Sequence, residues 1–178
     1  MKRILAVVVL FFTGSLVVTL ALTLIFMAGV SAAVSGIAAN QDSGQFLWPV
    51  PGYYEISDDY GWRICPFHGR EFHNAIDIVC PVGTPFIAVS SGTVVDAYYH
   101  YSFGNTVILD LGTASDGNRY TVQYCHMDSY TVRKGDSVTQ GQVIGYCWMT
   151  GDTTGPHTHF VMRQNGKSVD PKEYLQKD

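Results

Sequence analysis

Charge is scarce in this sequence, and over a long N-terminal stretch it is missing altogether. Charged residues make up 15% of the 178 residues, and the formal net charge at pH 7 is −4. No long basic run is present, which argues against nucleic acid as a main partner. Apolar residues make up 47% of the chain, but the N-terminus raises this fraction, so it does not indicate an unusually apolar core.

The sequence also has no Cys-x-x-Cys pair, although it contains four cysteines. This spacing excludes the usual pattern of a four-thiolate zinc site. In an oxidising compartment two disulfides are the natural outcome, and four cysteines allow three connectivities. We favour the pairs Cys65–Cys80 and Cys125–Cys147, because each pair brackets one part of the candidate site described below.

The uncharged stretch begins after Lys2-Arg3 and continues until Asp42. It is long enough to cross a bilayer, which takes about 20 residues. We therefore expect residues 1–34 to form a single transmembrane helix, with the N-terminus in the cytoplasm and the remaining chain outside the cell membrane. Cleavage after Val30-Ser31-Ala32 is the alternative, and it would release a secreted protein. Residues 35–46 read as a tether and residues 47–178 as one domain.

Helical periodicity is nearly absent from the predicted domain. Short β-rich runs separated by glycine turns predict an antiparallel sheet, a sandwich or an open barrel, so the expected fold class is mainly β. A loop is expected from Cys65 to Glu71, and a short helix near the C-terminus, with Asp170 as its N-cap and Pro171 in its first turn. The clearest predicted strands cover residues 85–89, 92–99, 105–111, 120–124 and 143–147.

Candidate site residues lie on three separate β-rich segments. His157 and His159 are two residues apart, so in a strand both imidazoles leave the same face. His73 and Asp77 are four residues apart and share a face in either a strand or a helix. His126 follows the predicted strand 120–124. Each residue alone is more often an ordinary polar residue of a sheet, and only their combination predicts a site.

These residue types match the ligands of a catalytic zinc site. Such a site takes three nitrogen or oxygen ligands from the protein and keeps a fourth position for water. The five candidates exceed the three ligands that are needed, which leaves two histidines for proton transfer and charge stabilisation. The spacing does not decide which three are the ligands.

Nine stretches of the sequence carry a family resemblance, and they occur in that family's order: 73–78, 81–85, 92–94, 103–110, 124–127, 132–138, 141–145, 155–160 and 169–171. With them, the sequence from about residue 58 to residue 175 resembles the M23 family of zinc metallopeptidases, of the lysostaphin or LytM type. The resemblance implies one zinc ion held by His73, Asp77 and His159. It implies that His126 and His157 are the catalytic pair, and that the substrate is a peptide bond of bacterial peptidoglycan.

The chain departs from the family pattern at two points. Ala75 stands where glycine is common, and the four cysteines are not a general family feature. Some relatives have lost their ligands and act as catalytically silent binding or regulatory proteins in cell-envelope complexes, so such a protein partner is the competing expectation. Because all five positions are filled in this chain, we expect a membrane-anchored endopeptidase.

Overall fold

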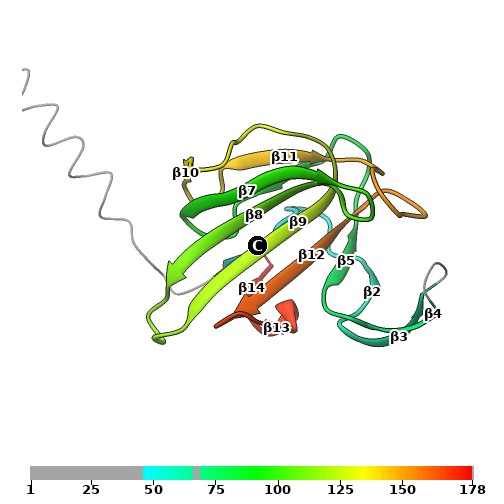
Figure 1. Ribbon diagram of the computed structural model, residues 1–178, viewed down its shortest axis with the longest axis horizontal. Coiled ribbons are helices and arrows are strands. Elements are labelled where there is room, and N and C mark those ends of the chain that lie inside the picture. The colour runs from blue at the N-terminus through cyan, green and yellow to red at the C-terminus, as the bar shows by residue number, and fades with distance from the viewer. Residues whose placement is uncertain (1–45, 66–68, 178) are drawn as a thin grey trace, which may run out of the picture. The chain divides into compact units, whose positions relative to one another are not determined.

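The regular structure of the protein is almost entirely β (Figure 1). The computed structural model describes residues 46–65 and 69–177. Their strands are β1 (Phe46–Leu47), β2 (Ile56–Asp58), β3 (Gly61–Cys65), β4 (Gly69–His73), β5 (Ile76–Val79), β6 (Pro85–Ile87), β7 (Gly92–His100), β8 (Gly104–Thr113), β9 (Arg119–Tyr130), β10 (Ser137–Val138), β11 (Val143–Cys147), β12 (His157–Gln164), β13 (Lys167–Val169) and β14 (Leu175–Gln176). A short 3₁₀ helix, η1, covers Pro171–Glu173.

One large antiparallel sheet organises the domain. Its strand order is β10-β7-β8-β9-β12-β5-β2, with β13 paired to β12 and with β11 paired to both β6 and β9. Strand β12 therefore lies between β5 and β9 (Figure 1), which brings three segments far apart in the chain side by side. The smaller sheets are the antiparallel hairpin β3–β4 and the parallel pair β1–β14.

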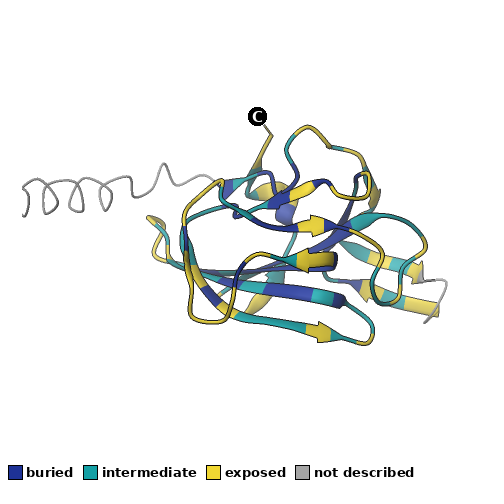
Figure 2. Cartoon of the chain, turned by 90° about the horizontal axis from the view of Figure 1, so that it is seen from above, coloured by how far each residue is buried: buried dark blue, intermediate teal, exposed yellow. Residues whose placement is uncertain are grey.

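The core consists of apolar side chains from the inner faces of these strands. Several strands carry both buried and exposed residues (Figure 2). The largest fully buried side chains include Trp48, Tyr124, Phe86, Phe160 and Ile144. Tyr124 on β9 and Phe160 on β12 are directly paired across the sheet and pack edge to face, with ring centroids 5.1 Å apart. This contact fixes β9 against β12 next to the histidine-bearing ends of both strands.

The mainly β, antiparallel fold predicted from the sequence is confirmed, and the predicted strands correspond to β6, β7, β8, β9 and β11. The loop expected from Cys65 to Glu71 is wrong in part, because its flanks belong to the hairpin β3–β4. The predicted short helix is present as η1, where the Asp170 carboxylate accepts a hydrogen bond from the amide of Lys172.

The predicted transmembrane segment, residues 1–34, and nearly all of the tether lie outside the described residues. Among the described residues, no helix has the length and apolar character needed to cross a membrane. The anchor therefore stays a prediction.

Neither favoured disulfide is formed. Cys80, Cys125 and Cys147 are buried free thiols. The Cys125 thiol accepts a hydrogen bond from the side-chain amide of Gln123 at 3.3 Å. The Cys147 sulfur lies 3.4 Å from the carbonyl oxygen of Cys80, so its cysteine neighbour is Cys80 and not Cys125. Pairing by position along the sequence was wrong because β11 ends beside the segment that follows β5.

Candidate metal centre

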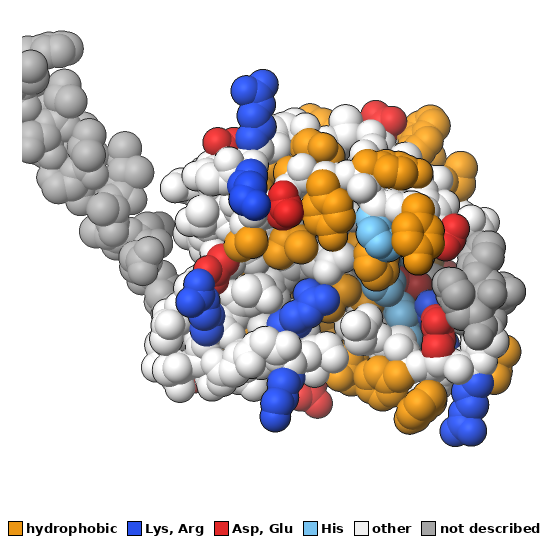
Figure 3. Space-filling view, viewed as in Figure 1, with side chains coloured by type: hydrophobic (Ala, Val, Ile, Leu, Met, Phe, Trp, Pro, Cys, Tyr) orange, Lys and Arg blue, Asp and Glu red, His pale blue; other side chains and the backbone are white. Residues whose placement is uncertain are grey.

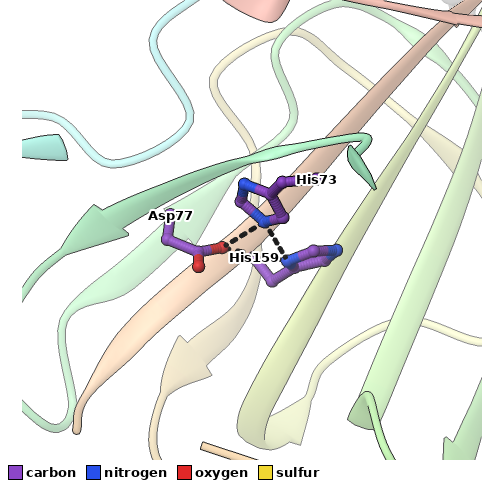
Figure 4. Close-up of side chains that lie close together, drawn as sticks. All are labelled: His73, Asp77 and His159. Carbon is purple, nitrogen blue, oxygen red and sulfur yellow. Dashed lines mark hydrogen bonds and ion pairs between the residues drawn. The ribbon is translucent and has the colours of Figure 1, made fainter. Parts of the chain in front are cut away.

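Three buried side chains meet at one point of the sheet: His73 from the end of β4, Asp77 from β5 and His159 from β12. They point toward one another (Figure 4). His159 Nδ1 lies 2.9 Å from Asp77 Oδ1 and 3.1 Å from His73 Nε2, and His73 Nε2 lies 3.3 Å from Asp77 Oδ1. Three potential metal-ligand atoms therefore converge, one from each residue.

The sheet register explains this convergence. His159 on β12 is directly paired with Asp77 on β5. His73 and Asp77 do not share one strand, because β4 ends at His73 and β5 begins at Ile76. The intervening bend turns His73 back over Asp77. Ala75, within this bend, is fully buried, so the packing there accepts a methyl group.

The separations fit a bound zinc ion. Zinc bonds of about 2.0–2.1 Å at tetrahedral angles place the ligand atoms about 3.4 Å apart, close to the distances seen between these three atoms. Lone pairs that face one another at such distances repel unless a proton or a metal ion lies between them. His73 Nδ1 donates to the backbone carbonyl of Asp59 at 2.9 Å, which leaves the lone pair on Nε2, the atom that faces the cluster.

The electrostatics of the cluster favour a cation. Burial raises the pKa of the Asp77 carboxyl, but the interactions with the facing imidazoles of His159 and His73 outweigh burial and hold the pKa well below its ordinary value. Burial also lowers the pKa of His159. Asp77 is therefore an anion beside a neutral imidazole, which is the protonation state that metal ligands need.

Arg63 holds the other oxygen of Asp77. Its guanidinium lies on the hairpin strand β3, 3.4 Å from Asp77 Oδ2, and is itself fixed by ion pairs with Glu71 at 2.7 Å and with Asp58. The carboxylate of Asp77 thus has one oxygen toward Arg63 and the other toward the two histidines. This arrangement presents a single oxygen to the candidate metal position.

A second pair of histidines stands beside the cluster. The rings of His126 on β9 and His157 on β12 have centroids 4.7 Å apart. His126 Nδ1 donates to the carbonyl of Thr150 at 2.7 Å, and His157 Nδ1 donates to the carbonyl of Gly155 at 2.8 Å. Both rings therefore keep the lone pair on Nε2, which can accept a proton. The Nε2 atom of His157 lies 3.8 Å from Asp77 Oδ1.

A β-bulge in β9 sets the orientation of the His126 side chain. Between the pairs Asn105–Met127 and Val107–Tyr124, β9 uses one residue more than β8. His126 lies in this bulge with φ of 60°, a left-handed conformation that is uncommon outside glycine. Burial lowers the pKa of His126 to about 4, so its imidazole is neutral near pH 7.

The five predicted residues line one cleft of about 530 Å³. Histidine side chains are visible in a hollow of the surface that hydrophobic side chains border (Figure 3). The structure thus brings together all five candidates, while the role of each stays a prediction. The sequence interpretation missed Arg63, because Arg63 reaches Asp77 only through the hairpin that was not predicted. It also missed the carbonyls of Asp59, Thr150 and Gly155, because backbone acceptors carry no sequence signal.

Comparison with known proteins gives concordant matches. The model of peptidase family M23 matches residues 71–171. Peptidoglycan DD-endopeptidase ShyA of Vibrio cholerae is 35% identical over 124 residues, which are 68% of this chain and 28% of that protein. Lysostaphin of Staphylococcus simulans is 34% identical over 143 residues, which are 78% of this chain and 27% of lysostaphin. The chain therefore spans less than a third of the length of these two curated relatives.

Solved structures show the same likeness. The catalytic domain of lysostaphin from Staphylococcus simulans superposes with a TM-score of 0.60 at 32% identity, covering 68% of this chain and 91% of that domain. A zinc-containing peptidase from Vibrio cholerae superposes with a TM-score of 0.61 at 32% identity, covering 71% of this chain and 39% of that one.

Proposed function

Because the chain belongs to peptidase family M23, we propose that it is a zinc-dependent endopeptidase that hydrolyses peptide bonds of bacterial peptidoglycan. The observation that carries the proposal is the meeting of His73, Asp77 and His159 within 3.3 Å of one another, in a cleft that also holds His126 and His157. Three ligands leave a coordination position open, which a catalytic zinc site requires and a structural site lacks.

In the proposed mechanism, His73 Nε2, Asp77 Oδ1 and His159 Nδ1 hold the metal, and Arg63 keeps the Asp77 carboxylate in its orientation. Zinc bound there would lower the pKa of its water toward 7 and would polarise the scissile carbonyl. The remaining steps belong to the histidine pair. Nε2 of His126 or His157 accepts the proton of the attacking water. The protonated ring then stabilises the oxyanion by a hydrogen bond and gives its proton to the leaving nitrogen as the C–N bond breaks.

The substrate class follows from the relatives. Shared sequence with a peptidoglycan DD-endopeptidase and with lysostaphin supports a peptidoglycan peptide as substrate. We further propose that residues 1–34 anchor the enzyme in the cell membrane with its catalytic domain outside the cytoplasm, where peptidoglycan lies. If the segment is cleaved after residues 30–32, the same domain is secreted.

The test measures zinc content and the release of soluble muropeptides from purified peptidoglycan by the full chain in detergent. His159→Ala should lose both zinc and activity, and His126→Ala should keep zinc while turnover falls by about 10²–10⁴-fold.

Thr158→Val is the matched control. Thr158 neighbours His159 on β12, is buried, and its hydroxyl makes no hydrogen bond to the described residues, so the near-isosteric change should leave zinc and turnover intact. Unchanged turnover in a folded His159→Ala variant would contradict the ligand assignment. Zinc binding without release of any fragment would instead favour a silent binding protein.

A further inference from the structure

The thiols of Cys80 and Cys147 lie together in the core, although 67 residues separate them in the sequence. Cys80 follows β5 and Cys147 ends β11, and the two residues are 1% and 0% exposed. The Cys147 sulfur lies 3.4 Å from the Cys80 carbonyl oxygen. This contact sets the side chain of Cys147 directly against Cys80.

The backbone around the two cysteines is held from both sides. The amide of Cys147 donates to the carbonyl of Thr84 at 2.8 Å, and the amide of Gly83 donates to the carbonyl of Cys147 at 2.9 Å. These bonds fix the end of β11 against the turn that follows Cys80. The third described thiol, Cys125, is buried elsewhere, beside Gln123. Cys80 and Cys147 are thus the pair of described thiols that the fold sets next to each other.

We propose that Cys80 and Cys147 form an oxidation site and become joined by an intramolecular disulfide when the protein folds in an oxidising medium. The oxidant is itself a disulfide, either a small-molecule disulfide or an oxidised thiol–disulfide oxidoreductase. One thiolate attacks a sulfur of the oxidant and releases a thiol. The second cysteine then attacks the mixed disulfide and releases the other thiol. The protein loses two electrons and two protons, and the oxidant gains them.

The order of events follows from burial. The folded protein shields both sulfurs, so exchange takes place before the core closes. While the chain is still open, either cysteine can supply the thiolate, which is the nucleophile in this exchange.

The cross-link would tie together two parts of the candidate metal centre. Cys80 lies three residues after Asp77, so it is continuous with the ligand strand β5. Cys147 opens the loop that carries Thr150, whose carbonyl orients His126, and that leads into His157. The disulfide would hold this loop to β5 and so limit movement between the ligand strand and the catalytic pair.

The test refolds the full chain in a buffer of reduced and oxidised glutathione, alkylates the free thiols and maps the peptides without reduction. The expected result is a peptide pair joined through Cys80 and Cys147, with Cys125 alkylated. Cys147→Ser should abolish the linked pair, and the control Cys125→Ser should keep it. Reduction should lower the melting temperature of the oxidised protein by roughly 10 °C, because a long loop loses its closure.

Two results would overturn the proposal: Cys80 joined to Cys65 or Cys125, or Cys80 and Cys147 both alkylated after refolding with excess oxidised glutathione. The wild-type map alone decides between these outcomes, even if a serine variant fails to fold. Because mass and melting temperature are read without substrate, failure of the disulfide and failure of the proposed hydrolase are distinguishable.

Discussion

Three histidines of the cleft make the same kind of hydrogen bond, from Nδ1 to a backbone carbonyl. The acceptors are the carbonyls of Asp59 for His73, Thr150 for His126 and Gly155 for His157. A carbonyl can only accept, so the proton stays on Nδ1 and the lone pair stays on Nε2. Three chemically identical rings thus differ in where Nε2 points, toward the candidate ligand cluster in one case and beside it in the other two, and their proposed roles rest on this difference.

Burial of neutral His126 makes stability depend on pH. Its pKa is lowered from 6.5 to about 4 in the folded protein, so between these values the unfolded chain binds more protons. Stability must therefore fall as the pH drops through this window, and this group contributes about 2 kcal/mol of loss between pH 7 and pH 5. Urea unfolding of the zinc-free protein at both pH values measures the total loss.

The matched variant for this prediction is His126→Gln, whose neutral amide can still donate to the Thr150 carbonyl. His73 opposes the trend, because its pKa is raised, so only the difference between wild type and variant isolates His126. The variant should lose less stability on acidification than the wild type. An equal loss in the two proteins would show that His126 is not buried in its neutral form.

Arg63 should tune the affinity for zinc through Asp77. Arg63→Lys keeps the positive charge but cannot hold Asp77, Glu71 and Asp58 at once. We expect zinc affinity to fall about 10–100-fold, as for other residues that orient a metal ligand. Competition with a fluorescent chelator measures it. Arg70→Lys is the control, since Arg70 lies on the same hairpin with its guanidinium over the Trp62 ring; equal affinity losses in both variants would point to the hairpin as a whole.

At the scale of elements, the start of β8 supports the proposed catalytic pair. Gly104 has φ of 64°, and a Cβ there would collide with Thr150, whose carbonyl orients His126. Gly104→Ala should therefore displace this carbonyl and reduce kcat/KM by about 10–100-fold, the scale of a misplacement near 1 Å, with zinc content unchanged. Muropeptide release and metal analysis of the same preparation give both numbers.

Gly117→Ala is the control for Gly104→Ala, because it introduces the same backbone strain without displacing a neighbouring residue. Gly117 has φ of 80°, but no other atoms lie within 4 Å of a Cβ built there. Both alanine variants should therefore lose stability, while Gly117→Ala keeps full activity. If the two variants lose activity equally, general strain and not the Thr150 contact is responsible.

Most of the elements were predictable because apolar and polar residues alternate in their sequence, as in Tyr120–Tyr124 of β9. The alternation indicates a strand but not a single buried face, because the structure buries six successive residues of β9, Val122–Met127. The hairpin β3–β4 gave no such signal. Trp62 and Ile64 on β3 are 69% and 77% exposed, so large apolar residues there do not mark a core face. The bulge at His126 was equally hidden, because its conformation depends on the pairing with β8.

At the scale of the whole molecule, the family motifs marked all five site residues. A strand's period of two applies only to His157 and His159, because His73 and Asp77 lie on two strands and His126 lies in a bulge. What could not be predicted were contacts between distant segments. Cys80 and Cys147 meet because β11 ends beside the segment following β5, and no local pattern encodes that meeting. Arg63 was missed for the same reason.

The proposed ligands come from β4, β5 and β12, so a metal that binds only the folded state should stabilise the whole domain. At free zinc about 1,000 times the dissociation constant, the gain is about 4 kcal/mol. Removing zinc with a chelator should therefore lower the melting temperature by roughly 10 °C, and zinc should restore it where magnesium does not, since magnesium prefers oxygen ligands.

Asp77→Asn decides whether this stabilisation passes through the cluster. The amide is nearly isosteric with the carboxylate but lacks its charge, so the variant should bind zinc weakly and melt at nearly the same temperature with and without chelator. The melting temperature of metal-free Asp77→Asn also measures how much the cluster changes the stability of the domain when no metal is bound. The reason is that the neutral amide, unlike the Asp77 carboxylate, does not favour protonation of the facing imidazoles of His73 and His159. A chelator-induced shift as large as that of the wild type would mean that zinc stabilises the protein at some other place.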